Sequence, residues 1–141
     1  MKKRKGFSLV ELMVVVAIMA VLAAIAVPNL LKSRQVANEQ AAQSALQTIS
    51  SALETYFTTF MTYPTLYSEL MATNPAFINT DYCDGQEHSG YLFFCDGSDG
   101  NGFSGMAVDD YDICAEPAAA ASGARCYQVS QGGILSTIAC P

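Results

Sequence analysis

The sequence has little positive charge beyond its first five residues. Four of its seven basic residues stand at positions 2–5, and none of its 13 acidic residues precedes Glu11. A chain cut after Gly6 would therefore keep three basic and 13 acidic side chains. Such a surface repels nucleic-acid phosphates and favours cations or basic partners, which argues against a nucleic-acid-binding function.

The patterns typical of catalytic and metal sites are also missing. The only histidine, His88, lies in a Gly/Ser/Glu-rich stretch with no nucleophile–base motif beside it, so we expect it at the surface. No two of the five cysteines form a C-x-x-C pair, which excludes zinc-ribbon, thioredoxin-like and haem-attachment motifs. The sequence therefore predicts neither an enzyme nor a bound cofactor or metal.

Two groups of oxygen-bearing side chains were weighed as ligand sites. The first is Asp84, Asp96, Asp99 and Asn101, and the second is Asp109, Asp110 and Asp112. Calcium prefers such oxygen ligands, but the spacing of the first group does not match an EF-hand loop, so we expect solvated turns. The second group is interpreted as a solvent-facing strand rather than an acid–base site.

A long apolar stretch lies near the N-terminus. Between Phe7 and Val27 only Ser8 and Glu11 are polar, and as a helix this stretch spans about 31 Å, the thickness of a bilayer core. It is too long for a secretory signal peptide, and no small-x-small cleavage site follows it. The basic residues before it predict a cytoplasmic N-terminus with the remainder outside. The widely spaced cysteines, interpreted as disulfides of an oxidising compartment, agree with that orientation.

The helix is predicted to continue beyond the apolar stretch. Pro28 is expected to kink it or break it locally. Further on, apolar residues recur at helical spacing and predict one buried stripe. The stripe consists of Ala42, Ala45, Leu46, Ile49, Ala52, Leu53, Tyr56, Phe57 and Phe60. The helix should end at Tyr63, because Pro64 follows.

The remaining residues predict short elements. Residues 65–71 are expected to form a short helix with Thr65 as its N-cap. The predicted strands cover residues 91–95, 106–114, 125–130 and 134–138, separated by turn-rich segments. Residues 116–124 are expected to be a flexible surface loop. The pattern predicts an α+β fold, in which the helical stripe packs on a small antiparallel sheet of three or four strands.

The stretch KGFSLVEL, followed by the apolar segment and Pro28, resembles the N-terminus of a type IV prepilin. The resemblance implies that prepilin peptidase cuts after Gly6 and that the new N-terminal residue, Phe7, is methylated. It also implies that Glu11 corresponds to the family's near-invariant glutamate and that Pro28 corresponds to its helix-breaking proline. The pilin fold is a long N-terminal helix on a small sheet, which agrees with the pattern above.

Four segments are expected on this basis. Residues 1–6 form a cleaved leader, 7–30 a transmembrane and filament-core helix, 31–62 the amphipathic half of that helix, and 63–141 the head domain. The expected function is a structural subunit of a type IV pilus, held in the inner membrane before assembly and extracellular afterwards. Its expected partners are copies of itself, the prepilin peptidase and the pilus assembly machinery.

Several other functions remain open from the sequence. A pseudopilin of a type II secretion system or a minor pilin would carry the same N-terminus. An anchored periplasmic enzyme would need a convergent catalytic set, which the sequence lacks. A plain anchored binding domain would need neither processing at Gly6 nor a charge at Glu11.

The odd number of cysteines leaves at least one outside any intrachain disulfide. The favoured pairing is Cys126–Cys140, which would close the last hairpin as in many pilins. Cys83–Cys95 comes next and would tie a loop to the first strand, leaving Cys114. A Cys114–Cys126 bridge across adjacent strands remains an alternative.

Glu11 is expected to set the register of assembly. An unpaired carboxylate in a packed apolar environment is costly, and the amine created at Phe7 of a neighbouring subunit would neutralise it at one stagger only. Alternatively, Glu11 marks the start of the membrane segment or helps the peptidase to recognise its substrate.

Overall fold

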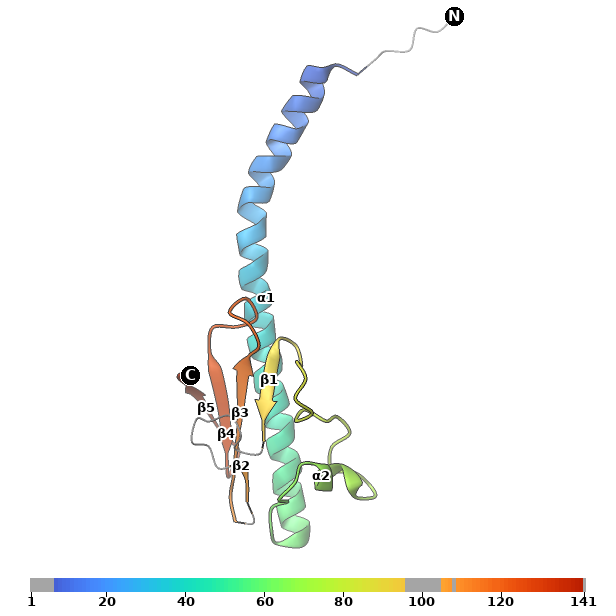
Figure 1. Ribbon diagram of the computed structural model, residues 1–141, viewed down its shortest axis with the longest axis vertical. Coiled ribbons are helices and arrows are strands. Elements are labelled where there is room, and N and C mark those ends of the chain that lie inside the picture. Colours follow the sequence, from blue (N-terminus) through green and yellow to red (C-terminus); the bar gives the residue numbers. More distant parts are fainter. Residues whose placement is uncertain (1–6, 96–104, 108, 141) are drawn as a thin grey trace, which may run out of the picture. The chain divides into compact units, whose positions relative to one another are not determined.

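A computed structural model describes residues 7–95, 105–107 and 109–140 (Figure 1). In chain order its elements are α1 (Leu9–Phe60), α2 (Ser68–Ala72), β1 (Tyr91–Phe94), β2 (Gly105–Met106), β3 (Tyr111–Pro117), β4 (Cys126–Ser130) and β5 (Ile134–Ile138). The sheet has the order β1-β3-β4-β5, and the two-residue β2 also pairs with β3. Every pairing is antiparallel. The predicted α+β fold, with a long N-terminal helix and a small antiparallel sheet, is confirmed.

The chain divides into two compact units, Met1–Arg34 and Gln35–Pro141, which are called here the N-terminal unit and the head unit. Helix α1 contributes its first part to the N-terminal unit and its second part to the head unit. The hydrophobic core belongs to the head unit, because every buried residue of the core cluster lies at position 42 or beyond.

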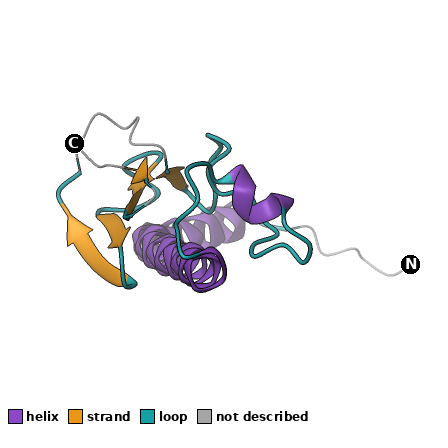
Figure 2. Cartoon of the chain, turned by 90° about the horizontal axis from the view of Figure 1, so that it is seen from below, coloured by secondary structure: helices purple, strands orange, loops and turns teal. Residues whose placement is uncertain are grey.

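In the head unit, α1 packs against one face of the sheet (Figure 2). Side chains alternate between the two faces of a strand, and the odd-numbered residues of β3 and β4 join the core. The buried residues that α1 contributes are Ala42, Ala45, Leu46, Ile49, Ala52 and Leu53. The buried strand residues of the same core cluster are Tyr91, Phe93, Tyr111, Ile113, Ala115, Tyr127 and Val129. The predicted helical stripe therefore forms the core as far as Leu53, and Tyr56 and Phe57 pack partly buried against it.

The end of α1 differs from the prediction. The helix ends at Phe60 rather than Tyr63, and the Phe60 side chain, which was assigned to the buried stripe, is 50% exposed. Met61 turns the chain with a φ of 62°. This turn lets Tyr63 fold back into the core, where its ring lies 4.6 Å from Phe57 and 5.1 Å from Tyr111 between centroids.

Two further predictions about local structure were wrong. The strand expected at 106–114 is divided between β2 and β3 by a turn, in which the Ala107 amide donates to the Asp110 carbonyl at 2.8 Å. The short helix begins at Ser68, not Thr65, and no side chain caps it. The Thr65 hydroxyl donates instead to the carboxylate of Glu69 at 3.0 Å.

Candidate functional site

The start of α1 is closed by the side chain of Glu11. Ser8 stands just before the first helical residue, and its carbonyl accepts the first intrahelical bond from the Leu12 amide at 3.3 Å. Glu11 Oε2 accepts the Ser8 amide hydrogen at 2.9 Å. A glutamate three residues after a serine N-cap, bonded back to the cap amide, is one half of a capping box. The S-x-x-E pattern at Ser8 indicates this role, which was not among the predictions above.

The apolar side chains of the N-terminal unit have no partner within the described chain. The large apolar residues between Leu9 and Leu31 are all 48% to 72% exposed, and Phe7 is 76% exposed. An 18-residue window of α1 reaches a mean hydropathy of 2.8, so this helix is long and apolar enough to span a bilayer. Exposed apolar area on this scale marks a surface that membrane or protein covers.

Helix α1 continues through Pro28, so the predicted local break is not found. Proline lacks the amide that would bond the carbonyl four residues earlier. The residues on both sides of Pro28 nevertheless keep helical geometry. A role of Pro28 in assembly stays a prediction.

The N-terminal part of the chain is similar in sequence to known proteins. Residues 1–27 match the model of the prokaryotic N-terminal methylation motif. The chain is 40% identical over 80 residues to type II secretion system core protein G of Vibrio cholerae, covering 53% of this chain and 55% of that protein. The match to the protein of the same name from Klebsiella pneumoniae is 39% over 72 residues, 51% of each chain. The type IV wide pilus major component PilA4 of Thermus thermophilus is 54% identical over 39 residues, 28% of this chain and 30% of that protein.

The methylation motif and the similarity to these relatives support a pilin or pseudopilin. The chain spans about half the length of the secretion-system relatives that it matches. The methylation motif together with the apolar helix indicates membrane anchoring. Of the two processing residues, Gly6 lies outside the described residues, and Phe7 precedes the helix.

The head unit contains two disulfides. Cys83 pairs with Cys95 and Cys126 with Cys140, with Cα–Cα distances of 5.9 and 5.3 Å. Both distances lie in the normal range for disulfides. Cys114 is buried and lies outside both bonds. The bridges hold the segment before β1 against that strand and the C-terminal segment against β4.

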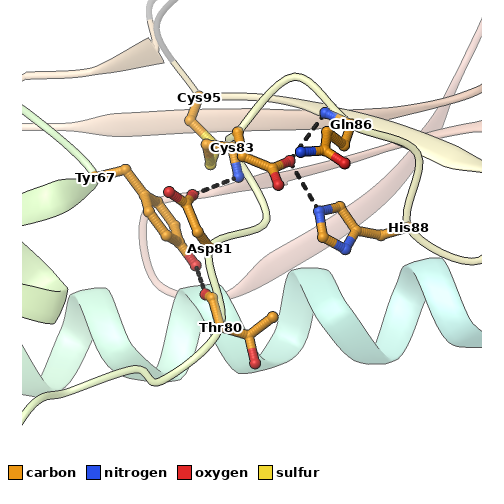
Figure 3. The surroundings of a disulfide bond; sticks show 8 residues. Tyr67, Thr80, Asp81, Cys83, Gln86, His88 and Cys95 are labelled. Carbon is orange, nitrogen blue, oxygen red and sulfur yellow. Dashed lines mark hydrogen bonds and ion pairs between the residues drawn. A yellow bond between two sulfur atoms is a disulfide. The ribbon is translucent and has the colours of Figure 1, made fainter.

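Local hydrogen bonds fix the loop around Cys83–Cys95 (Figure 3). The Cys83 amide donates to Asp81 Oδ1 at 3.0 Å, and the Tyr67 hydroxyl donates to the Thr80 carbonyl at 3.0 Å. Burial raises the pKa of Tyr67 above its ordinary value. The disulfide loop is therefore attached to the segment that leads into α2.

His88 is less exposed than the sequence analysis expected. Its Nε2 lies 3.0 Å from Asp84 Oδ1 (Figure 3). Its ring packs edge-on against Tyr82 and Phe93. Asp84 also accepts the Gln86 amide hydrogen, and this bond, followed by the one to His88, lowers the Asp84 pKa. Asp84 thus acts as a local turn acceptor.

Of the other oxygen-bearing residues, Asp109, Asp110 and Asp112 lie in the described part of the chain. Asp96, Asp99 and Asn101 lie outside the described residues. Asp110 accepts the Tyr111 amide hydrogen at 2.8 Å, and Asp112 accepts from the Gln128 side chain. In the described part of the chain, no group of three or more His, Cys, Asp or Glu side chains is placed to hold a metal.

Glu39 is a buried carboxylate that joins α1 to the loop between β3 and β4. It accepts the Ala124 amide hydrogen at 3.1 Å and the Tyr127 hydroxyl at 3.2 Å, and it lies 3.6 Å from the Arg125 guanidinium. A buried carboxylate needs such partners. Its position serves packing rather than chemistry.

Glu54 has the same function further along α1. It accepts hydrogen bonds from the Tyr111 hydroxyl at 3.1 Å, the Tyr63 hydroxyl at 3.2 Å and the Gly132 amide at 2.9 Å. Gly132 lies in the turn between β4 and β5. Two glutamates of α1 therefore fasten two successive hairpin connections of the sheet to the helix.

Proposed function

We propose that this chain is a structural subunit of a type IV pilus filament, anchored in the inner membrane before assembly. The proposal is supported by the difference in burial between the two units of the chain. The head unit closes its own core, whereas the N-terminal unit presents an uninterrupted exposed apolar surface. Only lipid or further apolar helices cover such a surface, and a subunit that moves from membrane to filament meets both in turn.

Glu11 would guide this transfer. A carboxylate has about four acceptor positions, so the bond from Ser8 leaves capacity for an incoming amine. Cleavage after Gly6 would create that amine at Phe7. A neighbour docked at the correct height places its amine beside Glu11, and other heights leave a charge unpaired in an apolar environment.

Mass spectrometry of the assembled chain tests the processing step. The expected product begins with an N-methylated Phe7, made by prepilin peptidase. Assembled protein that retains Met1 would contradict this proposal, because the leader would occupy the place of the amine.

The composition of filaments sheared from the cell surface tests the proposed role. A major pilin is the abundant chain in that fraction, and a minor pilin is present at a low ratio. The second candidate, a type II secretion pseudopilin, has support from the secretion-system relatives. It predicts that the chain stays in the cell envelope and that its deletion stops protein secretion while surface filaments persist.

A further inference from the structure

Positive charge is concentrated at one place beyond the proposed leader. Outside residues 1–6 the sequence has three basic residues, Lys32, Arg34 and Arg125, against 13 acidic ones. Lys32 and Arg34 are two positions apart and stand close to the end of the apolar stretch. This short segment of α1 is therefore positive in a chain that is otherwise strongly acidic.

Neither of these two basic side chains is used within the chain. Lys32 and Arg34 are exposed, and in the described residues no ion pair or side-chain hydrogen bond involves either of them. Neither has an acidic residue three or four positions away, the spacing at which ion pairs form on a helix. The next acidic residue of α1, Glu39, is buried and lies 3.6 Å from Arg125. The two charges are thus available to a partner outside the chain.

The spacing along α1 matches these charges to the outer boundary of a bilayer. The helix is continuous from Leu9 to Phe60, so Lys32 lies 21 positions, or about 32 Å, beyond Glu11. No charged residue stands between them. The hydrocarbon core of a bilayer is about 30 Å thick. With Glu11 at the cytoplasmic interface, Lys32 and Arg34 reach the headgroup layer of the opposite leaflet.

Basic residues are disfavoured on that side of a membrane helix. Lysine and arginine are enriched in cytoplasmic flanks and scarce in flanks that cross the membrane. In the proposed orientation, residues 2–5 are the cytoplasmic basic residues, and Lys32 and Arg34 lie on the translocated side. A basic pair at this position calls for a partner that compensates its charge. In the headgroup layer, that partner is the phosphate of an anionic lipid, which attracts nearby lysine and arginine side chains.

The two side chains leave the helix in different directions. Positions two residues apart differ by about 200° around the helix axis, so Lys32 and Arg34 lie on nearly opposite sides of α1. Their long aliphatic stems let the charged groups reach the headgroup layer. A guanidinium bonds a phosphate through two parallel N–H groups, whereas an ammonium binds it as a point charge. The geometry therefore predicts two separate phosphate positions, one for each residue.

We propose that Lys32 and Arg34 each bind the phosphate of an anionic phospholipid in the outer leaflet of the inner membrane. The proposal rests on the membrane anchoring in the proposed function and requires no filament. These contacts fix the depth of α1 before assembly. A shift toward the cytoplasm would draw Lys32 and Arg34 into hydrocarbon, and the opposite shift would draw in Glu11. Both shifts are costly.

Native mass spectrometry of the full chain in neutral detergent tests the proposal. The chain is titrated with phosphatidylglycerol and with phosphatidylcholine of the same acyl chains. Phosphatidylglycerol should bind about fivefold more tightly at each of two sites, since one basic residue at an anionic lipid surface contributes about that factor. Lys32→Gln and Arg34→Gln should each remove one site, and the double variant should lose both. Because residues 2–5 are also basic, only chains in the same state of processing are compared.

Three controls separate lipid binding from other effects of charge. Arg125→Gln removes one positive charge from the head unit and should keep both sites. The exchange of Lys32→Arg together with Arg34→Lys keeps both charges and should also keep both sites. Inorganic phosphate at the concentration of the lipid should displace neither lipid. Displacement by phosphate would identify a site for free anions and overturn the proposal.

A parent chain that binds the two lipids equally overturns the proposal, and so does a double variant with the lipid preference of the parent. If such a parent nevertheless needs Lys32 and Arg34 for filament yield, carboxylates of a neighbouring copy are their partner instead of lipid. Lipid binding is measured on the isolated chain, so its result is independent of whether the chain forms pili. The yield of sheared filaments decides that question separately.

Discussion

Leu22 in the N-terminal unit and Leu46 in the head unit both belong to α1, yet Leu22 is 63% exposed and Leu46 is fully buried. The same residue type on one helix thus has two uses. In the head unit, leucine stabilises the fold of a single chain. In the N-terminal unit, it contributes nothing to that fold and serves contacts outside the chain.

The two units also treat their glutamates differently. Glu39 and Glu54 accept hydrogen bonds from the sheet and its loops, whereas Glu11 accepts one from the adjacent Ser8. The comparison implies that stability and assembly are separable properties of this chain. Mutations in one unit should change one property and leave the other.

Glu11→Ala should have the largest effect, and on assembly alone. The variant should be processed and inserted into the membrane, with the head unit melting at the parent temperature. Loss of one partner of a buried pair costs about 3–5 kcal/mol, so filaments should be nearly absent. Sheared-filament yield in cells that lack the parent chain measures this effect.

Glu11→Gln is the matched control. Its side-chain oxygen still accepts the Ser8 amide hydrogen, but it carries no charge to pair with an amine. Failure of both variants supports charge pairing. Normal assembly of Glu11→Gln would assign the defect of Glu11→Ala to loss of the helix cap.

Leu46→Ala and Leu22→Ala test whether the two units contribute differently to stability. Removal of a buried leucine side chain costs about 2–5 kcal/mol, so Leu46→Ala should lower the Tm of the head unit strongly. Leu22→Ala should leave the Tm unchanged, because no described residue covers that side chain. Thermal melts of both chains in detergent provide the measurement, and equal shifts would refute the separation.

The disulfides should have a somewhat smaller effect, confined to the head unit. Replacing Cys126 and Cys140 by alanine should cost about 3 kcal/mol, since their sequence separation is 14 residues. Cys114→Ala should leave both bonds intact. Non-reducing peptide maps should recover Cys83–Cys95 and Cys126–Cys140, and a Cys114–Cys126 peptide would contradict this pairing.

Alkaline pH should weaken only the head unit, and this is the smallest effect expected. Burial raises the pKa of Tyr91 and of Tyr111 to about 12, above the ordinary value of 10.0. The stability that their protonated hydroxyls contribute is complete below pH 10 and is lost as the pH rises to about 12. Circular dichroism melts at pH 9 and pH 11 should show the loss. Tyr91→Phe should reduce its extent, and an unchanged Tm in the parent would contradict the assignment.

Helical periodicity correctly predicted which side chains of α1 are buried in the core. The stripe from Ala42 to Leu53 is the core, because residues at intervals of three and four share one helix face. The strand at Ile134–Ile138 has its predicted bounds, since Gly132 and Gly133 mark the turn before it. At the N-terminus, the leader pattern predicted the resemblance that the methylation-motif match supports.

The remaining features depend on contacts that periodicity does not encode. Phe60 continues the helical spacing, but the left-handed turn at Met61 ends the helix and leaves Phe60 exposed. The break between β2 and β3 follows from the backbone bonds between Ala107 and Asp110. Asp109 and Asp110 are a signal for this break in the sequence, because aspartate is depleted in strands and common in turns. The loop between β3 and β4 was expected to be flexible, but Gln35 and Asn38 donate hydrogen bonds to its Ala120 and Ser122 carbonyls from over 80 residues away in sequence.

The two glutamates that fasten the sheet have a mechanical consequence. Glu39 and Glu54 are 15 residues apart, or about 22 Å along α1. A tensile load applied along the helix axis would shear both attachments together rather than peel them one after the other. Bonds loaded in parallel share the force, so the head unit should travel with its helix as one body when the subunit is drawn out of the membrane.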